Sequence, residues 1–374
     1  MSANTGTANN DRELIKAEII KQNQQLLEKF KKEFLFDGME LKEGIERKEY
    51  YDGAVYIGMF DAGKREGKGL YTYKHGDAYF GSWKNDKFDG GGYYIFKRGE
   101  RYEGQLKENQ RDGVGTYYYA NGNIYEGKWK KDKKHGQGSY KNLMINELYE
   151  GEFVENQKNG FGVFTYRFGD RYEGNFLNND KSGKGTIYYK SGAVFEGNWE
   201  RDKAKGLGVF TYVNGDRYEG EFLNGMKNGS GTYIHVGGAV YEGSWRKDKK
   251  HGKGTVRYAN GDVYEGDFNQ GVREGTGAYS YTDGSKYTGM WHGDEKNGQG
   301  TLLYPSGDVF EGQFIGGLRQ GSGVIKYVNG DVFKGQFKNN MRHGYGEYTW
   351  ANGDMYKGEW IDDRCTGKGE VSKA

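Results

Sequence analysis

An aromatic residue recurs with a nearly constant spacing along most of this chain, and this recurrence constrains the fold more than any other feature. Twelve of the thirteen steps are 23 residues and one is 24. A glycine stands two places after each aromatic, and two more stand eleven and thirteen places after it. A short period repeated this often is typical of a repeat protein, in which each unit packs on its neighbours. The recurring aromatics are Tyr56, Tyr79, Tyr102, Tyr125, Tyr149, Tyr172, Phe195, Tyr218, Tyr241, Tyr264, Tyr287, Phe310, Phe333 and Tyr356.

Each repeat predicts two β-strands with polar turns between them. In Tyr125–Trp129 the aromatic, the glycine and the second aromatic alternate with variable residues, so they share one face of a strand. Joining the two strands of this hairpin predicts that Tyr125 lies opposite Tyr140 and Trp129 opposite Gly136. Glycine between the large rings leaves room for them. We therefore expect an all-β fold: an elongated, single-layer, twisted antiparallel meander of about fourteen hairpins, preceded by an amphipathic α-helix.

The sequence divides into four parts. We expect a disordered tail over 1–10, an amphipathic helix over 11–36 that starts with a capping box at Asn10 and Glu13, a partial repeat over 37–55 and the array over 56–374. The helix either caps the exposed first edge of the sheet or binds a partner or second copy; a helix on a membrane surface is a third reading. Its apolar side includes Ile15, Ile19, Leu26, Phe30 and Phe34.

The 24-residue step falls within 139–151, where Asn146 replaces the turn glycine. We expect a bulge or an enlarged loop there. It is either a tolerated insertion or a docking loop that uses Leu143, Met144 and Ile145.

The residues also resemble a known family. The pattern YEGxW/F, then GxG, then xYxxGD is similar to the MORN repeat, here in fourteen tandem copies over about 44–374. The resemblance implies an elongated antiparallel sheet that acts as a binding or scaffolding module. Family members include radial-spoke-head proteins of cilia and cytoskeletal scaffolds of protists, and a membrane association has been proposed for the repeat. Other members carry the array fused to a lipid kinase or a methyltransferase domain, and no stretch outside this array has room for one.

No catalytic constellation is predicted. The 55 basic and 53 acidic residues nearly balance, which disfavours nucleic acid as a partner, and no apolar run is long enough to span a membrane. The single cysteine, Cys365, excludes internal disulfides. His135, His251 and His343 occupy equivalent turn positions in separate repeats and are expected to be solvated. We therefore expect no enzyme activity, no cofactor and no metal.

One charged feature remains. Every repeat has Lys or Arg eight or nine places after its aromatic, from Arg65 to Arg364, which predicts a basic rim along one edge. This rim either contacts an acidic surface, such as phosphoinositide headgroups or tubulin tails, or only solubilises the turns. The candidate contacts are Lys130, Lys131, Lys133, Lys134, Arg246, Lys247, Lys249 and Lys250.

The preferred functional hypothesis is a non-catalytic scaffold in a cytoskeletal assembly, axonemal and similar to radial-spoke-head proteins, in the cytoplasm and cilium. Its partners would be other cytoskeletal or axonemal proteins, with end-to-end self-association at the open last strand as a further possibility. The alternatives are a phosphoinositide-binding scaffold at a membrane and a regulatory partner of a lipid kinase.

Overall fold

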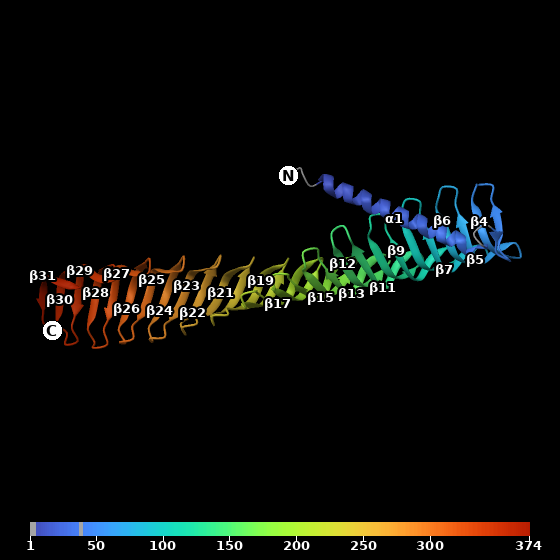
Figure 1. Ribbon diagram of the computed structural model, residues 1–374. Helices are drawn as coiled ribbons and strands as arrows, with labels where there is room; N and C mark the ends of the chain where they lie inside the picture. The colour runs from blue at the N-terminus through green and yellow to red at the C-terminus, as the bar shows by residue number, and fades with distance from the viewer. Residues whose placement is uncertain (1–4, 37–39) are drawn as a thin grey trace. The chain divides into compact units, whose positions relative to one another are not determined.

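The computed structural model describes residues 5–36 and 40–374 (Figure 1). It contains one helix, α1 (Thr5–Glu33), and a short two-stranded pair formed by β1 (Leu35–Phe36) and β2 (Glu40–Leu41). The remaining 29 strands, β3 to β31, follow one another as an open antiparallel meander. The all-β prediction is therefore confirmed.

The chain forms two compact units, one up to Ser191 and one from Lys203, with the residues between them divided. The strands of the N-terminal unit are β3 (Glu46–Glu49), β4 (Val55–Asp61), β5 (Lys64–Thr72), β6 (Ala78–Lys84), β7 (Lys87–Ile95), β8 (Arg101–Lys107), β9 (Gln110–Tyr118), β10 (Ile124–Lys130), β11 (Lys133–Asn142), β12 (Glu147–Val154), β13 (Gln157–Thr165), β14 (Arg171–Leu177) and β15 (Asp180–Tyr188). Strand β16 (Val194–Glu200) has residues in both units.

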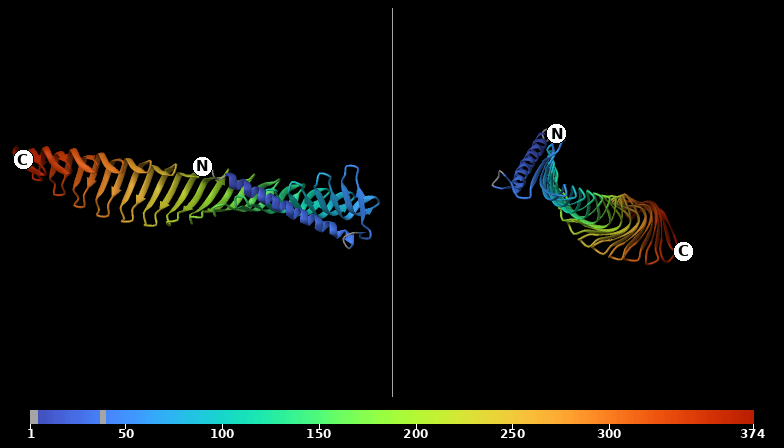
Figure 2. Two further views of the ribbon diagram at one scale, coloured as in Figure 1. Left: turned by 45° about the horizontal axis from the view of Figure 1, so that its top comes forward. Right: turned by 90° about the vertical axis from the view of Figure 1, so that its right-hand side faces the viewer.

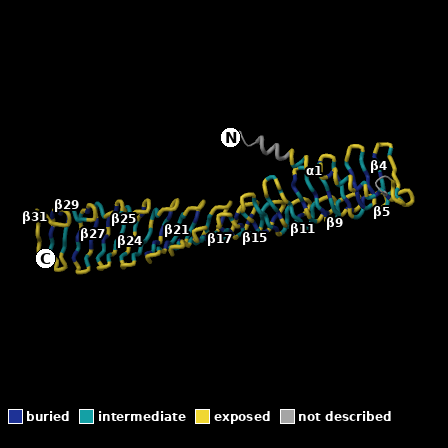
Figure 3. Tube along the Cα trace, viewed as in Figure 1, coloured by how far each residue is buried: buried dark blue, intermediate teal, exposed yellow. Residues whose placement is uncertain are grey.

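The strands of the C-terminal unit are β17 (Lys203–Thr211), β18 (Arg217–Leu223), β19 (Met226–Ile234), β20 (Val240–Arg246), β21 (Lys249–Arg257), β22 (Val263–Asn269), β23 (Val272–Ser280), β24 (Lys286–His292), β25 (Glu295–Leu303), β26 (Val309–Ile315), β27 (Leu318–Lys326), β28 (Val332–Lys338), β29 (Met341–Thr349), β30 (Met355–Ile361) and β31 (Arg364–Ser372). Within each unit, buried residues lie in mid-strand and exposed residues gather at the turns (Figure 3).

The register within a hairpin agrees with the prediction in one half and differs in the other. Tyr125 lies opposite Tyr140, as predicted, but Trp129 lies opposite Lys134 instead of Gly136. The register shifts between Gly127 and Trp129, where the second strand carries two extra residues. The prediction of Gly136 opposite Trp129 is therefore wrong, because a bulge interrupts the ladder and brings a cation to the position across from the tryptophan.

Each hairpin tip has the chemistry of a two-residue turn. Lys130 pairs with Lys133, and the two residues between them, Lys131 and Asp132, have φ of 48° and 66°. Positive φ at both central positions is the geometry that matches the twist of the flanking strands. At the opposite edge, a glycine such as Gly122, with φ of 86°, closes the turn into the next repeat. The molecule therefore has a basic-turn edge and a glycine-turn edge.

The 24-residue step does enlarge a loop. Asn142 pairs with Glu147, so four residues, 143–146, connect the strands, and Asn146 has φ of 54°. In the next repeat, by contrast, the amide of Tyr166 donates to the carbonyl of Asp170, which leaves three residues in the turn. Leu143 and Ile145 are exposed and Met144 is half-buried; their role as a docking loop stays a prediction.

The N-terminal helix differs from its predicted bounds. It begins at Thr5 and ends at Glu33, so residues 5–10 are helical where a disordered tail was predicted, and Asn10 lies inside the helix instead of capping it. Residues 1–4 and 37–39 of the predicted tail and partial repeat lie outside the described residues. Within the partial repeat, β3 pairs with β4, with Lys48 opposite Tyr56.

The helix packs on a face of the sheet and not, as the capping hypothesis expected, over its first edge. Phe30 and Phe34 form a buried cluster with Leu70, Phe80 and Ile95, joined by Leu26 and Leu27 of the helix. Phe80 directly follows Tyr79 in its strand, so the helix lies on the face opposite the repeat aromatics, here called the outer face (Figure 2). The reason is local, because these first repeats carry Ile57 and Phe80 where most later repeats carry glutamate.

Candidate binding surfaces

The aromatic face is a packed core and leaves little for a ligand to touch. Tyr125 is fully buried, and its ring meets Trp129 and Phe153 edge to face at 5.0 and 5.1 Å. Its hydroxyl donates to the carbonyl of Lys128 at 2.8 Å after passing over two glycines. A Cβ built on Gly127 or Gly138 would lie 2.7 or 2.6 Å from that hydroxyl. Burial raises the pKa of the Tyr241 hydroxyl, at the same position five repeats on, to about 12. These rings and glycines are therefore architectural.

A cation in most repeats is enclosed by these rings. The ammonium of Lys227 lies 4.7 Å from the ring of Trp245 and 5.1 Å from that of Tyr233, with Tyr212 and Tyr218 also within 6 Å. The guanidinium of Arg273 lies 4.3 Å from Trp291 in the same way. An acidic or amide side chain of the next repeat binds the backbone amide of the residue that carries the cation, as Asp248 does for Lys227 at 2.8 Å, and Asp294 also accepts from Nε of Arg273 at 3.1 Å. The cation, the rings and the acid together connect neighbouring repeats.

This arrangement divides the predicted basic rim. Lys134 and Lys250 are half-buried and lie 4.4 Å from Tyr140 and 4.7 Å from Tyr241. Burial, helped by the nearby Arg111 charge, lowers the pKa of Lys134 to about 8. The other six candidates are exposed at the basic-turn edge, three in each unit: Lys130, Lys131, Lys133, Arg246, Lys247 and Lys249. Lys133 also pairs with Glu155. Of the eight candidates, only these six are exposed, and their contact with an acidic partner stays a prediction.

The turn histidines are not solvated as expected. His135 and His251 are half-buried, and the Nδ1 atoms of both are buried without a hydrogen-bond partner. Both residues lie in the bulged segment, between the paired glycine and the enclosed lysine. In the part of the chain that the structure describes, no group of three or more His, Cys, Asp or Glu could hold a metal ion.

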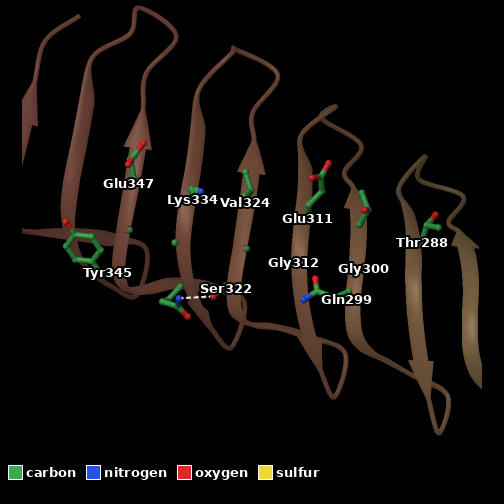
Figure 4. Close-up of a pocket in the computed structure, with 15 residues that line it drawn as sticks. Thr288, Gln299, Gly300, Glu311, Gly312, Ser322, Val324, Lys334, Tyr345 and Glu347 are labelled. Atoms are coloured by element: carbon green, nitrogen blue, oxygen red, sulfur yellow. Dashed lines mark hydrogen bonds between the residues drawn. The ribbon is translucent and has the colours of Figure 1, made fainter.

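The outer face of the C-terminal unit is hollowed into a shallow trough (Figure 4). It has a volume of ≈ 850 Å³ and crosses β24 to β29 over the paired glycines. Small and polar residues line its floor, among them Gln299, Thr301 and Ser322. Glu311, Lys334 and Glu347 supply charge. Since glycine and threonine project little from the sheet, the trough follows directly from the repeat pattern. An extended or helical segment would fit this shape better than a small molecule would.

In the N-terminal unit the same outer face carries α1. Asn23 is buried and donates to the carbonyl of Gly99 at 3.0 Å, and it accepts from the guanidinium of Arg101 at 3.2 Å. Lys68 of β5 pairs with Glu33 of the helix at 2.5 Å. Leu26, Phe30 and Phe34, predicted as partner-helix residues, are occupied by the sheet, and Ile15 and Ile19 are half-buried. A partner would have to displace the helix to reach this side. The sequence analysis did not predict that the helix packs on this face. A signal was present, because Ile57 and Phe80 are apolar at positions where most repeats carry glutamate.

The comparisons with known proteins agree on the repeat. The MORN repeat model matches fourteen times, from 56–78 to 356–372, with a shortened match over 125–141 before the enlarged loop. No curated protein matches this chain. Among the described residues, no helix is long and apolar enough to cross a membrane.

The solved structures that match this chain are distant. The TCP10 domain of Danio rerio CPAP, solved with a peptide of STIL, shares 12% identity and a TM-score of 0.37, covering 58% of this chain and 96% of that one. The TCP domain of Drosophila melanogaster SAS-4, solved with a proline-rich motif of Ana2, shares 13% identity and a TM-score of 0.28, covering 42% and 85%. The repeat matches extend over most of the sequence, so the chain belongs to the MORN-repeat family.

Proposed function

We propose that this chain is a non-catalytic scaffold in a cytoskeletal assembly, specifically the axoneme, as radial-spoke-head members of its family are. The observation behind the proposal is that charged side chains, which could bind ligands or take part in catalysis, are instead packed against aromatic rings. Aromatic rings enclose the charged groups of Lys227 and Arg273, and acids of the next repeat accept from the backbone amides of both residues. What each unit offers to the outside is therefore its turns and its outer face, which suit macromolecular contacts.

The test is fractionation of the tagged full chain in a ciliated cell. We expect it to stay with axonemes after extraction with non-ionic detergent and to need high salt for release, because repeated shallow contacts act together. A detergent-released membrane protein and a stable axonemal protein serve as markers. Recovery of the chain in the detergent-soluble fraction would contradict the proposal.

A second candidate function rests on the exposed turn cations. Binding to acidic phosphoinositide headgroups is favoured by three exposed cations at one turn in each unit, since such clusters attract anionic surfaces. The matched experiment replaces those six residues with Gln and compares pelleting with vesicles that contain or lack a phosphoinositide. The control replaces six exposed lysines away from the basic-turn edge: Lys74, Lys97, Lys190, Lys286, Lys334 and Lys368.

Loss of pelleting in the turn variant but not in the control variant supports lipid binding, and equal loss in both shows only a non-specific charge effect. Lys134 and Lys250 stay unchanged in these variants, because their loss would disturb the packing of the rings.

A further inference from the structure

The residue two places before each turn glycine forms a row along the glycine-turn edge. In the C-terminal unit every member of the row is exposed, and nearly all are apolar or small. We call this row the turn ridge; it consists of Val213, Val236, Ala259, Thr282, Pro305, Val328 and Ala351. Neighbouring members connect through the glycines, since a Cβ built on Gly215 would lie 3.4 Å from Val236 and one on Gly307 would lie 3.4 Å from Val328. A run of exposed apolar residues rarely lacks a purpose in a protein this polar.

The N-terminal unit shows what covers such a row. There, α1 touches the edge at two turns: Ile15 lies against Gly122 and Ile20 against Gly99. Both glycines are buried, whereas the equivalent Gly238 and Gly330 are exposed. The residues beside these two contacts are Ala120 and Leu143, both apolar. Row residues at other turns of this unit include Lys74, Arg167 and Lys190 and also the exposed Tyr51, whereas Lys97 belongs to the covered Gly99 turn. In this unit the helix therefore meets the glycine-turn edge at apolar residues, but apolar row residues also occur outside its contacts.

The geometry of a helix fits the repeat. Two strands advance the sheet by about 10 Å, and seven helical residues advance a helix by about 10.5 Å. One heptad therefore passes each repeat, so apolar side chains spaced by seven would meet successive members of the ridge.

The side chains on the outer face determine which charge a bound helix should carry. Below α1, the positions after the repeat aromatic are apolar, Ile57 and Phe80. In the C-terminal unit the same positions carry four exposed glutamates, while the other three repeats carry Thr288, Lys334 and Lys357; the glutamates are Glu219, Glu242, Glu265 and Glu311. A helix seated there needs apolar side chains toward the ridge and basic side chains toward these carboxylates. The residues directly before the repeat aromatics lie between the turn ridge and the outer face. Several of them, such as Val240, Val263 and Val332, are half-buried and add apolar contact.

We propose that the turn ridge and the adjoining outer face of the C-terminal unit bind a basic amphipathic helix of a partner protein, in the manner in which α1 occupies the N-terminal unit. This inference rests on the proposed function as an interaction scaffold and names the class of partner. The trough of Figure 4 continues this surface across β24 to β29, so the helix has both a floor and an apolar wall.

The experiment uses the full chain and three synthetic peptides of about four heptads each. All three have the same composition of apolar residues; the first has a heptad pattern flanked by Lys, the second the same pattern flanked by Glu, and the third a scrambled order with Lys. Binding is followed by fluorescence anisotropy. The ridge variant is Val213→Asp, Val236→Asp and Val328→Asp, and the matched control changes exposed apolar residues of the basic-turn edge: Leu223→Asp, Ile315→Asp and Ile361→Asp.

We expect the Lys-flanked heptad peptide to bind, the ridge variant to weaken it at least about tenfold, and the control variant to change it less than about twofold. A photo-crosslinker at position 236 should capture the bound peptide. No binding by the parent protein, equal loss in both variants, or equally tight binding of the Glu-flanked or scrambled peptide would overturn the proposal. A ridge variant that alters self-association of the chain alone would assign the surface to a second copy and also overturn it. Axonemal fractionation is scored separately, so a failed peptide test with intact fractionation removes this inference and leaves the scaffold function.

Discussion

The two units use the same repeat, yet their glycine-turn edges differ in what lies on them. In the N-terminal unit, Ile15 and Ile20 of α1 cover the turns at Gly122 and Gly99. In the C-terminal unit, equivalent turns at Gly215, Gly238 and Gly330 are exposed beside an apolar ridge. The internal ladder is the same in both, since Tyr125 and Tyr241 are equally buried. The repeat thus fixes the inner face, and the variable positions decide what each outer surface binds.

The largest expected effect comes from detaching the helix. Phe30→Ala together with Phe34→Ala removes two buried rings from the cluster with Phe80, and each such truncation costs about 3–5 kcal/mol. We expect α1 to lose its protection from hydrogen exchange while β17 to β31 keep theirs. Leu14→Ala is the control, because that side chain is exposed. Unchanged protection of α1 in the double variant would show that other contacts hold the helix.

The second prediction is that adding a methyl group to a paired glycine costs the same stability in the two units. Gly138→Ala and Gly254→Ala each place a methyl group about 2.6 Å from the hydroxyl of a buried tyrosine, Tyr125 or Tyr241. Such overpacking costs about 1–3 kcal/mol, measured as the free energy of local opening by hydrogen exchange. Gly237→Ala is the control, since a Cβ there would meet nothing within 4 Å. Different costs in the two units would mean that the inner faces are not equivalent.

Much of this molecule could be predicted from the sequence, because its period states which residues share a face. The alternation in Tyr125–Trp129 predicted the strands and the buried aromatics, and the opposition of Tyr125 and Tyr140 followed. The alternation could not reveal the bulge that places Lys134 opposite Trp129, since a register shift of two residues keeps the parity of both strands. The enclosed cations were therefore mistaken for part of a free rim.

The position of the helix was also beyond the repeat pattern. Its apolar side, with Phe30 and Phe34, was recognisable, but the choice between edge and face depended on side chains in a different segment, Leu70 and Ile95. Its start was misplaced because Asn10 and Glu13 have the pattern of a capping box and yet lie within a longer helix. Local sequence patterns therefore predict a helix well, whereas the place where the helix packs depends on contacts with distant residues.

A third prediction tests the difference between the two edges directly. Ala120→Lys should destabilise docking of α1 by about 1–3 kcal/mol, because the new side chain meets Ile20 beside the covered Gly99 turn and its charge loses water. Val236→Lys, at the equivalent place on the bare edge, should change stability by less than about 0.5 kcal/mol. Hydrogen exchange of α1 and of β20 reports the two effects. A large cost at Val236 would contradict the view that its edge is free in the isolated chain.

The smallest effect concerns one position that differs in charge between two repeats, one from each unit. Asp216 accepts from the amide of Val236 at 2.9 Å and the hydroxyl of Tyr233 at 2.8 Å, whereas the repeat of Tyr125 has Asn123 there, which donates to the hydroxyl of Tyr140 at 2.8 Å. The backbone and tyrosine hydrogen bonds lower the pKa of the Asp216 carboxyl to about 2. A carboxyl whose pKa is lower in the folded chain stabilises that chain above its ordinary pKa near 3.8, and this contribution is lost as the pH falls from about 4 to about 2.

Asp216→Asn should therefore reduce the stability of the C-terminal unit at pH 6, and the gap to the parent protein should close toward pH 2. Local opening of β18 and β19, followed by hydrogen exchange across this pH range, measures the gap. The control, Asn123→Asp, places a carboxyl beside Tyr140 and the amide of Leu143, so it should add a similar pH dependence to the N-terminal unit. A gap for Asp216→Asn that stays constant with pH would mean that shape, and not charge, distinguishes the two turns. If Asn123→Asp transfers the pH dependence, a single carboxyl is enough to convert one type of turn into the other. That result would support the view that the variable positions, and not the strand ladder, make each repeat different.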